Sequence, residues 1–263
     1  MSKINKTEVI RLTSVEKSLI EEIRKQNVKK KEKEVSKVKN TPIHFEKGKS
    51  RVLVIGDLHC PFDLDKYLDH CIKMYKEYNC NEVVFIGDII DSHYSSYHDS
   101  DPDGFGAGEE LERAVYRVSR YYKAFPNATV ILGNHDRIAS RKAFSGGVSK
   151  KWIKDYSEVL QTPNWSYVHS TVIDNVLYVH GEGGTARTRI KSEFQSIVQG
   201  HLHTQAYIDW IFNAITRVFG MQVGTGIDHD AYAFAYSKNG KKPAISCGVI
   251  LNGTLPILIP MEL

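Results

Sequence analysis

The sequence has few cysteines, no long apolar run and no apolar core of a signal peptide. Its four cysteines (Cys60, Cys71, Cys80 and Cys247) form no CxxC pair and no disulfide-dense pattern, which favours a reducing, cytoplasmic compartment. No stretch approaches the roughly 18 apolar residues that a membrane span needs, and the N-terminus is polar and rich in lysine. We therefore expect a cytoplasmic protein that has no membrane partner.

Positive charge is concentrated at the N-terminal end of the chain. Residues 1–50 contain 14 Lys and Arg against 7 Asp and Glu, whereas the remaining residues contain 21 against 24. The stretch 13–26 has a Thr–Glu capping-box pattern and an apolar stripe at helical spacing, while 27–40 has almost nothing to bury. We divide the chain into a basic, helical or flexible extension at 1–49 and a domain at 50–263. The extension is an arm that contacts nucleic acid, a helix that docks on a partner subunit, or a solvated tail.

Beyond the extension, short apolar runs alternate with helical patterns. The runs lie at 52–55, 83–86, 129–132, 176–179 and 196–199. Amphipathic helices are predicted at 64–79 and 109–125, between the first three runs. The C-terminal part is β-rich and contains Asn-Gly pairs at 239–240 and 252–253, which are typical of hairpins. This order predicts an α/β fold with a substantial buried sheet.

Polar side chains follow these apolar runs. Ligands of open α/β sheets bind outside the carboxyl ends of the strands, so we expect these side chains to gather at one edge. Alternate residues of an extended chain point the same way, so Asp57 with His59, and His201 with His203, could each grip an ion together. Carboxylates mixed with neutral imidazoles suit Mn, Fe, Zn or Ni, and burying so many polar groups without cations would be costly. The residues are Asp57, His59, Asp88, Asp91, Asn134, His135, His180, His201 and His203.

Five short motifs, GDLH, GDIID, GNHD, VHGE and GHLH, occur in the order of the calcineurin-like metallophosphoesterase superfamily, which the chain resembles. The motifs cover residues 51–205, and the β-rich end extends the resemblance to 51–263. The resemblance implies the four-layer α/β/β/α sandwich of that superfamily. The DPDG segment and the stretch GTGIDHDAYAFAY also resemble members carried by bacteriophages, which would place the protein in the cytoplasm of the host.

The resemblance implies a role for each motif residue. Asp88 would bridge two metal ions. His135 would lie beside the leaving group, and Asp91 would orient His135. The first metal would be held by Asp57, His59 and His203 as well, and the second by Asn134, His180 and His201.

The implied reaction is hydrolysis of a phosphate ester. Two divalent cations, with Mn²⁺ preferred and Fe, Zn, Ni or Mg as alternatives, would lower the pKa of a water, and the resulting hydroxide would attack phosphorus in line. His135 could donate a proton or a charged hydrogen bond to the departing oxygen. The scheme needs no covalent phosphoenzyme.

Two loops beside the motifs are candidates for the substrate pocket. Residues 92–108 include His93 and His98, which could stack on a base or contact a phosphate, or could be ordinary loop packing. The basic run at 137–151 includes Arg137 and Arg141, which suit a polyanionic substrate, although the run could be surface charge without a role. We predict these four side chains to be substrate-binding residues.

Departures from the family pattern narrow the function. Asp91 is followed by Ser92 and His93, so the second motif lacks the Arg of the GDxVDRG pattern of protein Ser/Thr phosphatases. We expect a phosphodiesterase that acts on nucleotides, cyclic phosphates, RNA or DNA, in preference to a phosphomonoesterase or protein phosphatase. Two further alternatives are a non-catalytic scaffold with this fold, although no expected ligand is missing, and a nucleic-acid-binding module driven by the basic extension. The oligomeric state is not predicted.

Overall fold

The computed structural model describes residues 49–97, 101–231, 233 and 242–263, together with four positions near the N-terminus. The chain divides into two compact units, Met1–His44 and Phe45–Leu263. In the first unit the described positions are helical and exposed, namely Ser18, Glu21, Glu22 and Lys25. The predicted capping box and apolar stripe at 13–26 lie outside the described residues. All that follows concerns the second unit.

The described strands of this unit form two sheets. In the first, the order is β11-β10-β1-β2-β3-β4, with β1 to β4 parallel and β10 antiparallel to β1. The predicted apolar runs at 52–55, 83–86 and 129–132 supply three adjacent strands at its centre, because such runs suit strands buried on both faces. The strands are β1 (Arg51–Ile55), β2 (Glu82–Phe85), β3 (Ala128–Ile131), β4 (Trp165–Val168), β10 (Ser246–Leu251) and β11 (Leu255–Pro260).

The second sheet has the order β5-β6-β7-β9-β8. Its parallel pair of β6 and β7 corresponds to the predicted runs at 176–179 and 196–199. The strands β8 and β9 form an antiparallel hairpin at its edge. The strands are β5 (Ser170–Ile173), β6 (Val176–Val179), β7 (Ser196–Gln199), β8 (Tyr207–Phe212) and β9 (Arg217–Gln222).

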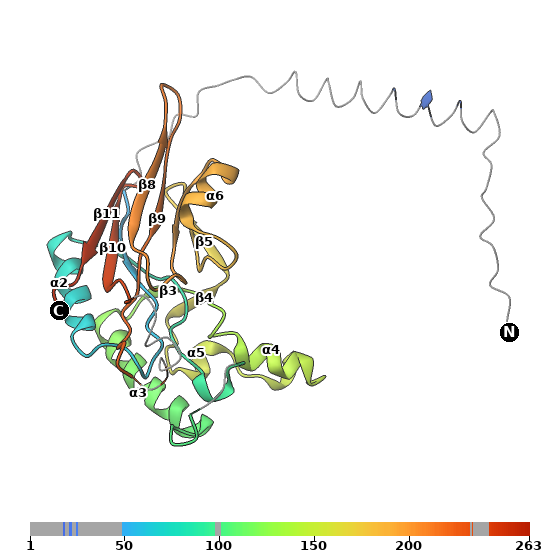
Figure 1. Ribbon diagram of the computed structural model, residues 1–263, viewed down its shortest axis with the longest axis vertical. Coiled ribbons are helices and arrows are strands. Elements are labelled where there is room, and N and C mark those ends of the chain that lie inside the picture. The colour runs from blue at the N-terminus through green and yellow to red at the C-terminus, as the bar shows by residue number, and fades with distance from the viewer. Residues whose placement is uncertain are drawn as a thin grey trace. The chain divides into compact units, whose positions relative to one another are not determined.

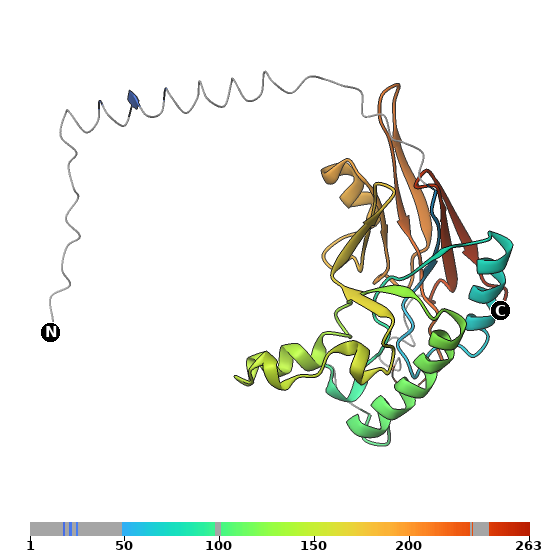
Figure 2. The same cartoon turned by 180° about the vertical axis from the view of Figure 1, so that it is seen from behind.

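Helices lie outside both sheets. The predicted helices at 64–79 and 109–125 are present as α2 (Tyr67–Glu77) and α3 (Ala107–Ala124). Figures 1 and 2 show α2 and α3 on the side of the first sheet and α6 beside the second. The other described helices are α4 (Ile138–Ser145), α5 (Tyr156–Val159), α6 (Ala186–Glu193) and the short 3-10 turns η1 (His93–Ser95) and η2 (Lys150–Trp152).

Alternation along β1 shows how the layers are held together. Leu53 and Ile55 pack in the core that contains the buried faces of α2 and α3. Val52 and Val54 belong to the core between the sheets, with Tyr178 and others. A smaller cluster places α6 against the outer face of the second sheet. The result is the predicted α/β/β/α order of layers. One large core lies between the first sheet and its helices, and another lies between the two sheets.

The C-terminal hairpin confirms one local prediction. Asn252 and Gly253 lie between β10 and β11 with φ values of 52° and 65°, the left-handed conformation that a tight hairpin turn requires. The Asn-Gly pair at 239–240 lies outside the described residues. Among the described residues, no helix combines the length and the apolar character needed to cross a membrane.

Candidate metal centre

The motif residues meet where strands from both sheets end. Asp57 and His59 follow β1, Asp88 follows β2, and His180 and His201 follow β6 and β7. His59, Asp88 and His201 have φ values of 50°, 48° and 69°, a left-handed backbone that non-glycine residues rarely adopt. Such conformations persist where the surrounding structure over-determines them, and they cluster at functional sites. The turns therefore aim these side chains into one place.

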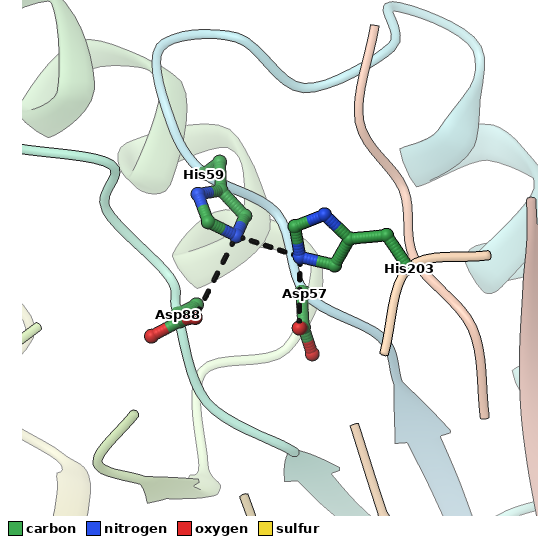
Figure 3. A group of neighbouring side chains, drawn as sticks. All are labelled: Asp57, His59, Asp88 and His203. Atoms are coloured by element: carbon green, nitrogen blue, oxygen red, sulfur yellow. Dashed lines mark hydrogen bonds and ion pairs between the residues drawn. The ribbon is translucent and has the colours of Figure 1, made fainter. Parts of the chain in front are cut away.

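The first group of ligand atoms contains Asp57, His59, Asp88 and His203, all within 4.8 Å of one another (Figure 3). The Nε2 atoms of His59 and His203 are 3.0 Å apart. His203 Nε2 lies 3.2 Å from Asp57 Oδ2, and His59 Nε2 lies 3.6 Å from Asp88 Oδ2. This is the set predicted for the first metal together with its bridging carboxylate.

A second group shares Asp88 with the first and adds His180 and His201. His180 Nε2 lies 3.1 Å from Asp88 Oδ2 and 3.2 Å from His201 Nδ1. Asn134 Oδ1 is 3.0 Å from the same His180 nitrogen, so the amide oxygen also faces this group. The structure thus brings the predicted second set together around one carboxylate that both groups use.

The donor atoms fit divalent cations. Asp57 Oδ1 is fully buried and has no hydrogen-bond partner among the described residues. A buried carboxylate oxygen without a partner is costly, and a cation would satisfy it. His180 Nδ1 lies 3.0 Å from the carbonyl oxygen of Ile86, which can only accept, so Nδ1 donates there and Nε2 is the atom that faces the centre. Mixed carboxylate and neutral imidazole donors suit Mn, Fe, Zn or Ni.

Charges in the centre shift the protonation of its side chains. Burial alone would raise the pKa of Asp88, but the neighbouring His180 outweighs burial and the pKa lies below its usual range. Burial lowers the pKa of His59, and the nearby His135 lowers it further. Burial would lower the pKa of His180, but the charges of Asp88 and Asp57 outweigh burial and raise it to about 10. His180 therefore has to release a proton when a metal binds, whereas Asp88 and His59 already favour the forms that bind metal.

Two glycines keep space for the carboxylates. A Cβ atom on Gly133 would lie 2.1 Å from Asp88 Oδ1, and one on Gly200 would lie 2.2 Å from Asp57 Oδ1. Neither carboxylate can move away easily, because Asp57 and Asp88 are buried. The GNHD and GHLH motifs therefore need glycine at these positions, because the Asp88 and Asp57 carboxylates lie too close for a side chain.

The loops after β1 and β2 are joined by backbone hydrogen bonds. The amides of Leu58 and His59 donate to the carbonyl oxygen of Asp88 at 3.1 and 2.8 Å. The amide of Asp91 in turn donates to the carbonyl oxygen of Cys60 at 3.0 Å. These bonds hold two ligand-bearing loops in a fixed register without using the ligand side chains.

The carboxylate of Asp91 has a second partner besides the predicted His135. Its Oδ1 lies 2.5 Å from His59 Nδ1 and 3.4 Å from His135 Nδ1. The His135 ring is also held by the backbone carbonyl oxygen of Asp91, 2.6 Å from Nδ1. Asp91 therefore contacts His135, as the prediction requires, and its carboxylate also holds His59.

His135 lies at the open side of the centre. Its side chain is 18% exposed, and its backbone amide donates to Asp88 Oδ1 at 2.8 Å. Burial works to lower the pKa of His135, but Asp88 and Asp91 outweigh burial and the pKa is raised. His135 can therefore carry a proton in a place that a substrate can reach.

Asp136 supports the GNHD loop. Its Oδ2 accepts from the amide of Gly133 at 2.9 Å, and its Oδ1 accepts from the amide of Ile90 at 3.2 Å. Burial and the nearby Asp88 raise the pKa of Asp136 to about 6. Its burial and these two hydrogen bonds show that Asp136 is a support of the loop and not a solvated acid.

The predicted substrate-binding residues are not equivalent. His93 is buried with its Nδ1 3.9 Å from Asp91 Oδ2, which is in keeping with the loop-packing alternative. His98 lies outside the described residues. Arg137 is at the rim, where its Nε donates to the Gly133 carbonyl oxygen at 3.0 Å and its guanidinium pairs with Glu182. Arg141 is exposed, with its guanidinium carbon 5.4 Å from the centre of the Tyr97 ring.

Two supporting residues escaped the sequence reasoning. Glu110 of α3 accepts from the amides of His93 and Tyr94, at 2.6 and 2.9 Å, and so holds the segment that follows Asp91. Arg117 of α3 donates to Asp63 Oδ1 at 2.7 Å, in the loop that follows His59. The only sequence signal was their place in an amphipathic helix, which does not reveal their partners.

A cavity of about 710 Å³ lies next to the centre, between α3, α5 and β4. Asp136 and Arg137 line it, but none of the predicted metal ligands does. The candidate site is therefore identified by the donor atoms that converge at the strand ends, and not by this cavity.

Comparison with known proteins gives one sequence family and several structures. The model of the family described as Calcineurin-like phosphoesterase matches residues 50–214, which include every predicted ligand. Vacuolar Protein Sorting 29 from Cryptosporidium parvum is 14% identical with a TM-score of 0.42, over 81% of this chain and 90% of that chain. YfcE, a phosphoesterase from E. coli, is 11% identical with a TM-score of 0.37, over 76% and 87%. The Pseudomonas putida nuclease MPE is 14% identical with a TM-score of 0.37, over 80% and 87%. No curated protein matches.

Proposed function

We propose that this chain, which belongs to the calcineurin-like phosphoesterase family, is a binuclear metal-dependent phosphodiesterase. Its substrates would be nucleotides, cyclic phosphates or nucleic acid, and Mn²⁺ would be the preferred metal. The observation that carries the proposal is the pair of ligand groups that share Asp88. The cytoplasmic location and bacteriophage origin expected from the sequence stay predictions.

The residues divide between two cation positions. Asp57, His59 and His203 would hold one cation, and Asp88 would lie between both. When bound, the two cations supply Lewis acidity toward the phosphate oxygens and a hydroxide at neutral pH. The second cation would be held by Asn134, His180 and His201.

His135 provides the proton chemistry of the chain. The carbonyl oxygen of Asp91 can only accept, so the proton of the neutral His135 ring lies on Nδ1. Nε2 is then the atom that can hold a second proton and release it to a departing oxygen. The backbone amide of His135 donates to Asp88, which keeps the ring beside the shared carboxylate.

The charge at the rim supports a diester in preference to a monoester. Arg137 is the nearest cationic side chain in the sequence after His135, and Glu182 pairs with it. Ser92 occupies the position of the Arg in the GDxVDRG pattern of protein phosphatases. A phosphodiester carries one negative charge and a monoester carries about two, so a site with one compensated arginine at its rim suits the diester.

The test is a hydrolysis screen of the full chain, stripped of metal and reloaded with Mn²⁺. Substrates are p-nitrophenyl phosphate, bis-p-nitrophenyl phosphate, 2′,3′-cyclic nucleotides and labelled RNA and DNA. We expect diester turnover, and a fall in kcat of about 10²- to 10⁴-fold in His135→Ala, whose metal content stays that of the wild type. His169→Ala, which removes an exposed histidine, is the matched control.

Two results would overturn the proposal. One is a preference for the monoester over every diester. The other is the absence of turnover on all substrates while two metal ions per chain are bound, which would indicate a scaffold with this fold.

A further inference from the structure

A protruding segment beside the centre combines cationic and aromatic side chains. Residues 137–154 contain six Lys or Arg and no Asp or Glu. Figure 2 shows α4 projecting away from the sheets. We use the name α4–η2 surface for the exposed side chains of Tyr97, Arg141, Lys142, Phe144, Lys150 and Trp152.

The aromatic rings of this surface face solvent to an unusual degree. Phe144 and Trp152 are each 84% exposed, and Tyr97 is 64% exposed. Large apolar side chains in such positions lose the free energy that burial would provide. A cluster of them next to a functional centre marks an interaction site.

The cations of the surface are available to a ligand. Within the part of the chain that the structure describes, Arg141, Lys142 and Lys150 have no acidic partner, whereas Lys154 pairs with Glu158. Arg141 and Lys142 each lie 5.4 Å from the centre of the Tyr97 ring. The surface thus presents positive charge directly beside π faces.

Both segments of the surface leave the metal centre itself. The segment that ends at Tyr97 follows Asp91, and α4 begins directly after the loop that carries His135. Lys142 Nζ donates to the carbonyl oxygen of Ser96 at 3.4 Å, which ties the two segments together. The eight residues of α4 span about 12 Å at 1.5 Å per residue, so a chain of a few nucleotides would bridge the distance.

We propose that the α4–η2 surface binds single-stranded nucleic acid and guides it to the metal centre. Unpaired bases would stack on Phe144, Trp152 and Tyr97, and the intervening phosphates would contact Arg141, Lys142 and Lys150. This combination of stacking platforms and cations is how proteins bind single strands without sequence preference. The inference rests on the proposed function for its cleavage step, but the binding can be measured separately.

The chemistry of the surface favours this ligand over others. A duplex keeps its bases stacked inside and would leave the exposed rings unused. A protein partner is disfavoured because lysine is depleted at the buried core of protein interfaces. An anionic lipid surface could bind the cations and the aromatic rings, but it would offer no substrate to the adjacent phosphodiesterase centre. Binding to lipid is therefore one of the outcomes that the experiment distinguishes.

The experiment measures fluorescence anisotropy of a fluorescein-labelled dT12 strand with the full chain carrying His135→Ala, which slows cleavage about 10²- to 10⁴-fold. We expect Phe144→Ala combined with Trp152→Ala to weaken binding about tenfold or more, since each lost stacking contact weakens the hold on a base. Arg141→Ala combined with Lys150→Ala should lower the slope of log K against log salt by about 1.4, at about 0.7 for each phosphate contact.

Matched controls remove similar side chains elsewhere. Tyr116→Ala removes a ring that is 70% exposed on α3, and Lys73→Ala with Lys76→Ala removes two exposed cations on α2. Neither should change the binding of dT12. Because every variant keeps residues 1–44, any affinity of the basic extension is the same in all of them.

Turnover separates this inference from the proposed function. With His135 present, Phe144→Ala combined with Trp152→Ala should leave kcat/KM for bis-p-nitrophenyl phosphate within about twofold, since the rings lie outside the reacting centre. Binding that follows the expected pattern in a chain without diester turnover would support the surface and contradict the proposed function.

Three results would overturn the inference. The first is dT12 binding that is unchanged when both rings are removed. The second is a 12-base-pair duplex bound as tightly as dT12. The third is binding to phosphatidylserine vesicles that depends on Phe144 and Trp152 without any binding of dT12.

Discussion

The two sheets contribute to the same centre in different ways. Asp57, His59 and Asp88, from the first sheet, are at most 1% exposed. From the second sheet, His180 is also buried, at 3% exposed, but His201 and His203 are half-buried, and the His203 side chain is 23% exposed. The first half is rigid because backbone bonds join its loops to each other, and the second half completes the centre from the solvent side. The hydrogen bonds of the protein alone therefore fix the first half. The full set of candidate ligands forms only where the second sheet packs against the first.

The largest expected effect comes from Asp88, the residue that both ligand groups share. We predict that Asp88→Asn lowers kcat/KM by about 10³-fold or more and lowers the metal content from two ions toward none, because a bridging carboxylate neutralises both cations. Elemental analysis after dialysis and diester hydrolysis measure the two effects. His203→Ala should retain one metal ion more readily than Asp88→Asn. Equal losses of metal in the two variants would show that the two sheets contribute equally to metal binding.

The next effect concerns the frame of the first half. Arg117→Ala should lower the free energy of unfolding by about 3 kcal/mol, because it leaves the buried Asp63 carboxylate without its cation. Chemical denaturation measures the change.

Arg113→Ala is the matched control on the same helix. Its ion pair with Glu109 joins side chains that are 53% and 52% exposed, so we expect a change of about 0.5 kcal/mol or less. Similar losses in the two variants would mean that the Arg117–Asp63 contact does not secure the loop that follows His59.

The contact between the halves is tested by Gly200→Ala. The new Cβ atom would lie 2.2 Å from Asp57 Oδ1 and 2.5 Å from Ile86 Cγ2, so the second-sheet loop must move away from the frame. We expect a loss of about 1–3 kcal/mol in stability from overpacking and weaker metal binding, measured by thermal unfolding and by metal titration.

Gly108→Ala provides the contrast, since its Cβ atom would meet nothing within 4 Å. At this helical position alanine should be neutral or stabilising by about 0.5–1 kcal/mol. If Gly200→Ala binds metal like the wild type, the two halves are less closely fitted than the structure indicates.

The sequence predicted which candidate ligands lie together better than it predicted the residues that support them, for a physical reason. Each ligand follows a strand within a few residues, so the local pattern of an apolar run and a polar turn is enough to find it. The sequence placed Asp91 beside His135 but did not reveal that its carboxylate also contacts His59, 32 positions away. Arg117 and Asp63 are 54 positions apart. Which helix lies over which loop depends on packing of the whole domain, and no short motif encodes it.

The same reason explains the layers and the α4–η2 surface. Alternating burial along β1 follows from its position between two cores, whereas the apolar run alone indicated only a buried strand. Phe144 and Trp152 read as ordinary apolar residues in the sequence, and only the structure shows that they are exposed beside unpaired cations. Exposure of an apolar side chain is a property of the fold, and composition does not predict it.

The smallest expected effect is a pH dependence at Glu110, which supports the first half from α3. Burial raises the pKa of this carboxyl above its usual value of 4.5, although the amides of Tyr94 and His93 oppose the shift. A carboxyl with a raised pKa binds its proton more tightly in the folded state. Its contribution to stability is therefore present below the usual pKa and is lost as the pH rises through the raised value.

Glu110→Gln removes this titration and keeps an oxygen that can accept from the two amides. We expect the free energy of unfolding of the wild type, relative to Glu110→Gln, to fall as the pH rises from 4.5 through the raised value, and to be constant on either side of that window. Urea denaturation between pH 4 and pH 8 measures the difference, with Glu109→Gln as the exposed control. A relative stability that rises with pH would mean that the two amides and not burial dominate at Glu110, so that α3 holds the first half through an ionised carboxylate.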